Sequence, residues 1–105
     1  MNLNQELFNQ YMQGEDRPLL VEFTAPWCMY CRRLASAMET VEKQYADTLH
    51  IGFVNIDEQE ALSDREGVEV IPTLKLYRGG KCLGTVVNPP SKAKIDQFIA
   101  ETLNQ

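Results

Sequence analysis

Hydrophobic residues near the start of the chain recur at intervals of three and four, the spacing of one helix face. This pattern predicts an amphipathic helix over residues 4–13, and Gly14 followed by Pro18 ends it. The apolar positions are Leu3, Leu7, Phe8, Tyr11 and Met12. The run "LLVEF" at 19–23 is short, continuous and rich in strand formers, so it predicts a buried central strand.

A second helical pattern begins at a pair of cysteines. The loop "TAPWC" follows the first strand, and from Cys28 onward apolar residues again repeat at helical spacing over about four or five turns. These apolar positions are Leu34, Met38, Val41 and Tyr45. Cys28 and Cys31 therefore lie at the N-terminus of a helix that follows the carboxyl end of a strand, where open α/β sheets usually place their sites.

The second half of the chain completes a mixed sheet. We expect a strand over 51–56, a short helix that begins at a capping box of Asp57 and Glu60, and an end to that helix near Gly67. The segments 73–77 and 82–87 form a hairpin across "RGGK", and Ser91 caps a last helix. This order predicts a single α/β domain over residues 1–105, with a mixed four- or five-stranded sheet and helices on both faces.

Charge and hydropathy exclude several functions. A net charge of -5 lacks the basic face on which nucleic-acid binding depends. No apolar run approaches the roughly 18 residues of a membrane-spanning helix, and Met1 to Gln13 lacks the basic start and apolar core of a signal peptide. We therefore expect a cytoplasmic monomer without nucleic-acid or membrane partners.

The cysteine pair admits three interpretations: a structural disulfide, half of a metal site, or a redox centre. Cytoplasmic thiols are kept reduced, which disfavours a permanent disulfide, and zinc needs four ligands, which the distant Cys82 and His50 supply only with poor spacing. At a helix N-terminus the thiol of Cys28 is predicted to have a lowered pKa and to attack disulfides, whereas Cys31 resolves the mixed disulfide. Cys28 is expected to be exposed and Cys31 less so. Cys82 is expected to pack as a small apolar strand residue.

Four segments together resemble the thioredoxin family over nearly the whole chain: "LLVEFTAPWCMYCRRL", "VNID", "VIPTLKLYRGGK" and the final helix. The resemblance implies a thioredoxin-like fold and a thiol-disulfide oxidoreductase that acts on disulfide-containing proteins. It also implies a cis peptide bond before Pro72, a substrate-binding backbone at Ile71, a substrate contact at Trp27, and a thioredoxin-reductase-like electron donor. No bound cofactor is needed for this reaction.

The chain departs from the family pattern at several positions. Met29 and Tyr30 replace the usual Gly-Pro, Phe53 stands where a lysine often accompanies the strand acid, and Asn88 replaces a glycine of the substrate groove. Ser36 stands where a helix-kinking proline is common. Only Met1 to Leu3 remain for the N-terminal edge strand of the family, so we expect this strand to be short or absent. Two alternatives follow: a glutaredoxin-like enzyme that uses glutathione, suggested only by Tyr30, and a non-catalytic thioredoxin-like interaction module.

The remaining candidate residues surround the cysteines. Strand alternation places Glu22 opposite Leu19, Val21 and Phe23 in a strand covered on both faces, so we expect Glu22 to be buried and to exchange a proton with Cys31 through water. Met29 and Tyr30 are predicted to form an apolar contact surface for partners. Arg32 and Arg33 are expected to form a solvated face, and one of them alternatively adds positive potential near Cys28.

Overall fold

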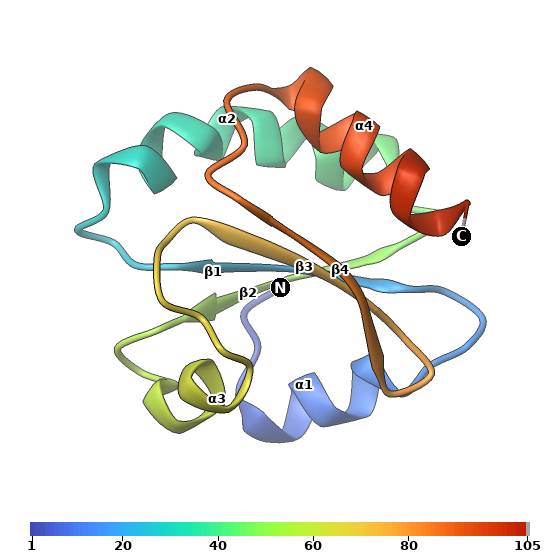
Figure 1. Cartoon of the computed structure of the whole chain (residues 1–105), viewed down its shortest axis with the longest axis horizontal. Helices are drawn as coiled ribbons and strands as arrows, with labels where there is room; N and C mark the ends of the chain where they lie inside the picture. The colour runs from blue at the N-terminus through green and yellow to red at the C-terminus, as the bar shows by residue number, and fades with distance from the viewer. Residues whose placement is uncertain (105) are drawn as a thin grey trace.

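The computed structural model describes residues 1–104, in which four strands form a sheet between two layers of helices (Figure 1). The strand order is β2-β1-β3-β4, with β2 parallel to β1 and the other neighbours antiparallel. This is the expected α/β class with a mixed sheet. The elements in chain order are α1 (Gln5–Met12), β1 (Leu19–Thr24), α2 (Met29–Gln44), β2 (His50–Asn55), α3 (Glu60–Arg65), β3 (Thr73–Arg78), β4 (Lys81–Val87) and α4 (Lys92–Leu103).

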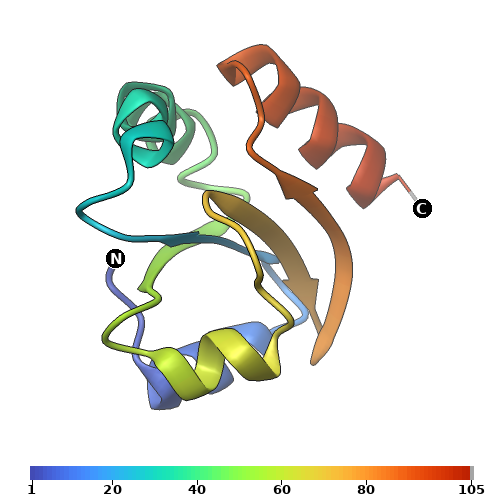
Figure 2. The same cartoon turned by 60° about the vertical axis from the view of Figure 1, so that its left-hand side comes forward.

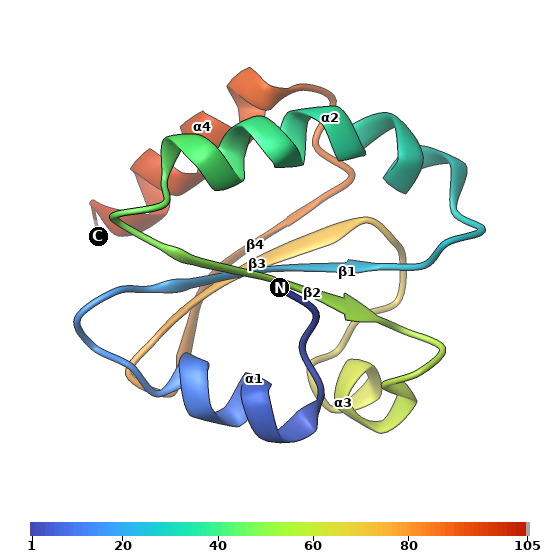
Figure 3. The ribbon, with the colours of Figure 1, turned by 180° about the vertical axis from the view of Figure 1, so that it is seen from behind.

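Each face of the sheet carries its own hydrophobic cluster because side chains alternate along the strands. Helices α2 and α4 cover one face, and α1 and α3 cover the other, as the two opposite views in Figures 1 and 3 show. In β1, Leu20 belongs to the cluster under α2 and α4, whereas Leu19, Val21 and Phe23 belong to the cluster on the other face. Glu22 therefore points to the α2 side, among apolar residues.

The helices begin and end largely where the sequence predicts. Asn4 and Ser91 cap α1 and α4, since each side chain accepts a hydrogen bond from a backbone N–H in the first turn. The predicted capping box at Asp57 is wrong: α3 begins at Glu60 without a side-chain cap, and the N–H groups of Asp57 and Glu58 instead donate to the side chain of Asn55. None of the helices among residues 1–104 is long and apolar enough to cross a membrane.

The predicted hairpin is confirmed, but its cysteine is not buried. Gly79 and Gly80 both have positive φ angles, 59° and 81°, which a tight hairpin turn requires and glycine accepts without strain. The expectation that Cys82 packs as an apolar residue is wrong, because Cys82 is exposed. Cys82 lies beside this turn on β4. β4 forms one edge of the sheet (Figure 2).

The N-terminal edge strand is reduced to a single bridge, as expected. Asn2 pairs in parallel with Phe53 of β2, and backbone hydrogen bonds of 2.8 Å join Leu3 N–H to the Phe53 carbonyl and Phe53 N–H to the Met1 carbonyl. The side chain of Leu3 is only 3% exposed and lies directly over Gly52. A Cβ atom at position 52 would lie 2.4 Å from Leu3 Cδ1, so glycine at this position permits the first residues to dock.

Replacing Gly52 with alanine should therefore destabilise the protein by about 1–3 kcal/mol, the usual cost of overpacking a filled site. In a Leu3→Ala background the same substitution should cost much less, because the atoms that it would meet are gone. Chemical denaturation of the four proteins of this double-mutant cycle measures the coupling. Equal costs in both backgrounds would show that Leu3 does not pack on Gly52.

Candidate active site

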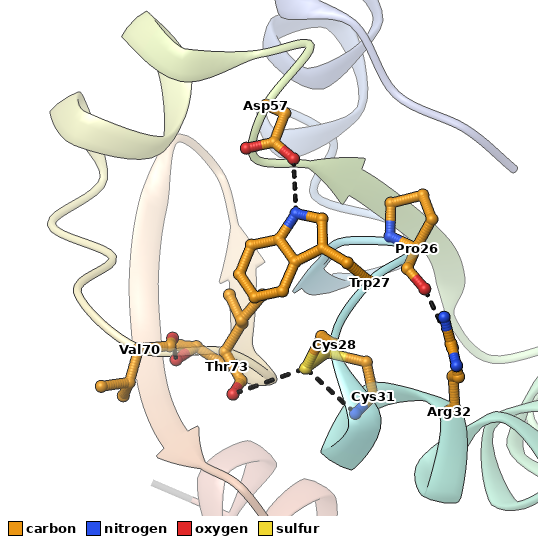
Figure 4. The surroundings of a disulfide bond; sticks show 9 residues. Pro26, Trp27, Cys28, Cys31, Arg32, Asp57, Val70 and Thr73 are labelled. Atoms are coloured by element: carbon orange, nitrogen blue, oxygen red, sulfur yellow. Dashed lines mark hydrogen bonds between the residues drawn. A yellow bond between two sulfur atoms is a disulfide. The ribbon is translucent and has the colours of Figure 1, made fainter.

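Two loops meet at one edge of the sheet because β1 and β3 run antiparallel. Phe23 near the end of β1 pairs with Thr73 at the start of β3, so the chain leaving β1 and the chain entering β3 lie side by side. This pairing brings Cys28 to the loop before β3, where its Sγ atom lies 3.9 Å from the carbonyl oxygen of Ile71 (Figure 4). Two segments that are more than forty residues apart in the sequence thus form one site.

The two cysteines form a disulfide at the start of α2, with Cα atoms 5.2 Å apart. Cys28 is the N-cap residue of this helix, and its Sγ accepts a hydrogen bond of 3.2 Å from the backbone N–H of Cys31. The free N–H groups and the partial positive charge at a helix N-terminus stabilise a thiolate at this position. The two cysteines therefore differ in their position on the helix: Cys28 is the N-cap residue and Cys31 lies in the first turn.

The expected difference in exposure between the two cysteines is wrong. Cys28 is 5% exposed and Cys31 is 6% exposed, so both are buried to the same extent in the disulfide form. Both pack with Ala25 and against the partly buried Ile56 and Ile71, which cover the disulfide from the sheet side. The surroundings of the two sulfur atoms distinguish them instead: Cys28 faces the loop before β3, whereas Cys31 lines the cavity that contains Glu22.

The loop before β3 has a fixed shape. The peptide bond between Ile71 and Pro72 is cis, as the resemblance implied, and the hydroxyl of Thr73 donates to the carbonyl of Val70 at 2.6 Å. On its other side, the N–H of Asn88 donates to the Pro72 carbonyl at 2.7 Å. Asn88 has φ of 46°, a left-handed conformation that favours glycine and that asparagine tolerates better than most residues.

Exposed apolar side chains surround the disulfide. Trp27, Met29 and Tyr30 are each more than half exposed, as predicted for a contact surface. The indole N–H of Trp27 donates to a carboxylate oxygen of Asp57 at 2.7 Å, which holds the ring between α3 and the disulfide (Figure 4). Val70 adds a further exposed apolar side chain from the loop before β3.

Asp57 and Val70 also lie at this site, although sequence patterns predicted neither of them there. Asp57 was interpreted as a helix cap, although it follows β2, which is parallel to β1, and the pairing of Thr24 with Asn55 brings the two strand ends together. The carboxyl ends of adjacent parallel strands meet at one sheet edge, and this rule would have placed Asp57 near Trp27. Val70 had no local signal, because its exposure depends on the course of the loop.

Glu22 is buried below the disulfide, as predicted. It is 3% exposed and pairs in the sheet with Phe53 on β2 and Leu74 on β3. Its Oε2 atom is buried and has no hydrogen-bond partner within residues 1–104. Burial raises the pKa of this carboxyl to about 7, because the charged form loses its hydration. A cavity of about 340 Å³ between the sheet and α2 is lined by both Glu22 and Cys31.

Other candidate residues lie elsewhere or contact the site only from outside. His50 is at the start of β2, where its ring packs on Tyr11 with centroids 4.9 Å apart. Arg32 is exposed, and its Nε donates to the Pro26 carbonyl at 3.0 Å (Figure 4). Among residues 1–104, no group of three or more His, Cys, Asp or Glu side chains is arranged to hold a metal ion.

Comparison with known proteins agrees with this geometry. The family model described as thioredoxin matches residues 1–101. The chain is 33% identical over 103 residues to a thioredoxin of Alicyclobacillus acidocaldarius, covering 98% of this chain and 97% of the relative, and 33% identical over 96 residues to thioredoxin 1 of a Nostoc species, covering 91% and 90%. A chloroplastic M-type thioredoxin of Chlamydomonas reinhardtii is 32% identical over 97% of this chain and 73% of its own length. The chain therefore belongs to the thioredoxin family, and it is a thiol-disulfide oxidoreductase whose redox-active pair is Cys28 and Cys31.

Proposed function

We propose that Cys28 is the attacking thiol and Cys31 the resolving thiol in the reduction of protein disulfides. The thiolate of Cys28 attacks one sulfur of the substrate disulfide, forms a mixed disulfide and releases the first substrate thiolate. The thiolate of Cys31 then attacks Cys28 Sγ, which closes the protein disulfide and releases the second substrate thiolate. Two electrons and, after protonation, two protons pass from the cysteine pair to the substrate.

One observation carries this assignment: Cys28 caps α2 with its sulfur directed at the loop before β3. The N–H of Cys31, 3.2 Å from Cys28 Sγ, supplies a hydrogen bond that strengthens when the sulfur is a thiolate. Ile71 lies on the other side of this sulfur, so a substrate strand placed along Ile71 presents its own disulfide to Cys28. Cys31 lies inside the helix and faces Glu22, where attack on an incoming substrate is not favoured.

Glu22 is proposed to exchange a proton with Cys31. The two residues line one cavity, and a cavity of about 340 Å³ with polar groups has room for the water that would connect them. A carboxyl with a pKa near 7 exists in both protonation states at neutral pH, which suits a group that accepts the proton of Cys31 and returns it. Phe53 beside it supplies no charge, so burial alone sets this pKa.

Five residues are proposed to bind substrate: Trp27, Met29, Tyr30, Ile71 and Pro72. The first three give exposed apolar area next to the disulfide, and such area typically marks a contact surface for partners. The Ile71 carbonyl oxygen lies 3.9 Å from Cys28 Sγ, so an extended substrate backbone placed along Ile71 and Pro72 would lie beside the attacking sulfur.

Family membership supports a general class of partners. Membership of the thioredoxin family implies disulfide-containing protein substrates and a reductase in general. We further propose that the electron donor resembles thioredoxin reductase and that the protein is located in the cytoplasm, where thiols are kept reduced. We also propose that it is a monomer with one domain over residues 1–105; residue 105 lies outside the described residues.

The roles of the cysteines are tested by trapping, in a Cys82→Ser background because Cys82 is an exposed free thiol. The reduced Cys31→Ser protein should accumulate a mixed disulfide between Cys28 and a substrate with intact disulfides, such as oxidised insulin, whereas the Cys28→Ser protein should form none and reduce nothing. Mass spectrometry of the adduct after proteolysis identifies the linked cysteine. Trapping through Cys31 in the Cys28→Ser protein, at the rate of the first variant, would reverse the assignment.

The raised pKa of Glu22 predicts that the free energy of unfolding depends on pH. Its folded pKa of about 7 lies above its ordinary value of 4.5, so the unfolded chain loses this proton first, and stability falls as the pH rises from 4.5 through 7. Glu22→Gln removes this loss, so the stability of the variant relative to the parent should increase between pH 4 and pH 8 by up to about 3 kcal/mol. Urea unfolding of the oxidised proteins at the two pH values measures the change.

The matched control for this prediction is Glu101→Gln, which removes an exposed carboxylate on α4. Its stability relative to the parent should change little between the same pH values. Glu22→Gln should also slow insulin reduction at pH 7 by removing the proton acceptor of Cys31. A variant that reduces insulin at the parental rate and shows no pH-dependent gain would exclude both the buried charge and the catalytic role.

A further inference from the structure

The substrate surface continues into a cavity on the α2 side of the disulfide. Its volume is about 280 Å³. Asn88, which lines this cavity, is hydrogen-bonded to the loop before β3, because its N–H donates to the carbonyl of Pro72. A substrate segment that lies along Ile71 and Pro72 therefore reaches this cavity without leaving the surface. The residues that line it are Tyr30, Arg33, Leu34, Asn88, Pro89 and Pro90.

Arg33 is the charged group of this cavity, and no acid within residues 1–104 forms an ion pair with it. Its guanidinium carbon lies 5.5 Å from the ring centroid of Tyr30, and its Nη2 atom lies 3.9 Å from the sulfur of Met29. The ion pairs found among residues 1–104 involve Arg65 and Lys92, not Arg33. The cation–π contact with Tyr30 and the weak hydrogen bond from Nη2 to Met29 Sδ hold the guanidinium at the cavity. Its remaining N–H groups are available to a carboxylate, which guanidinium groups bind in a bidentate manner.

The opposite side of the disulfide has the reverse charge. A cavity of about 550 Å³ there is lined by Trp27 and Val70 and by carboxylates of α3 and its flanking loops. These acids are Asp57, Glu60, Asp64 and Glu69. Because the whole chain also carries a net charge of -5, an acidic substrate is repelled from the Trp27 side, whereas Arg33 attracts it on the Asn88 side.

We propose that Arg33, positioned by Tyr30, is a specificity-determining residue that binds an acidic side chain of a protein substrate close to the substrate's reactive cysteine. The acids on the Trp27 side strengthen the preference by disfavouring a carboxylate there. This inference deepens the proposed function and rests on Cys28 being the attacking thiol. The substrate class that fits is a disulfide segment with an acidic residue on one side of its cysteine and no acidic residue on the other.

The helix geometry sets the distance of this acid from the substrate cysteine. Arg33 is five positions after Cys28, a rise of about 7.5 Å along the axis of α2. Two residues of extended chain span about the same length. The acid should therefore lie about two residues from the substrate cysteine, on the side of the chain that is directed toward Asn88.

The test uses symmetric peptide dimers, each made of two identical peptides joined by one disulfide, so that attack on either sulfur gives the same products. Glu, Gln or Lys stands two residues before the cysteine in one series and two residues after it in another. The reduced Cys82→Ser protein and its Arg33→Gln and Arg33→Glu derivatives are mixed with each dimer at low salt. The released peptide is followed by chromatography, which gives a rate constant for each pair.

The measured quantity is the ratio of the rate constants for the Glu and Gln dimers within one protein, which cancels any change in the intrinsic reactivity of Cys28. In one of the two series this ratio should fall two- to fivefold from the parent to Arg33→Gln, the effect of one exposed ion pair. Arg33→Glu should lower it further and raise the ratio for Lys over Gln. Added salt should bring the ratios of all proteins together.

Lys43→Gln is the matched control, because it removes one positive charge from the far end of α2 and should keep the parental ratio. Equal ratios in the parent and Arg33→Gln in both series would refute the role of Arg33. A fall of the same size in Lys43→Gln would also refute it, because the effect would then come from the net charge of the protein. The proposed function is tested separately by Cys28→Ser. If that protein reduces the neutral Gln dimer at the parental rate, the attacking thiol is misassigned, whatever the ratios show.

Discussion

The central pairing of β1 with β2 and β3 determines where the chemistry takes place. Because β1 is parallel to β2 and antiparallel to β3, the chain leaves β1, leaves β2 and enters β3 at one edge of the sheet. The three loops at this edge carry Cys28, Asp57 and Ile71, which lie near one another although they are far apart in the sequence. A shift of one residue in either register would turn Glu22 to the opposite face and separate these groups.

The centre of the same sheet holds a buried carboxyl group, that of Glu22. Position 22 lies between two other strands and under a helix. Burying a charged group at such a position costs a large amount of folding free energy. Phe53 beside it fills space but offers neither charge nor hydrogen bond to the acid. The arrangement is explicable if reactivity at Cys31, rather than stability, determines which residue stands there.

Periodicity and local chemistry predicted most of the fold but not the exposure of individual side chains. The helices, the central strand and the glycine turn follow from patterns within a few residues of each other, and so does the burial of Glu22. The exposure of Cys82 and the equal burial of Cys28 and Cys31 depend on which strand is outermost and on which loop covers the disulfide. Neither is encoded in local spacing. The cis bond at Pro72 came only from family resemblance, since most X-Pro bonds are trans.

Trp27 is the single tryptophan of the chain, and it lies on the surface rather than in the core. Its indole is 62% exposed and is tied to Asp57 through one hydrogen bond. The tryptophan fluorescence of this protein therefore originates beside the disulfide, and it senses events there more directly than the integrity of the two hydrophobic clusters. An unfolding curve recorded by tryptophan emission follows the opening of this edge, whereas circular dichroism follows the loss of the sheet and helices.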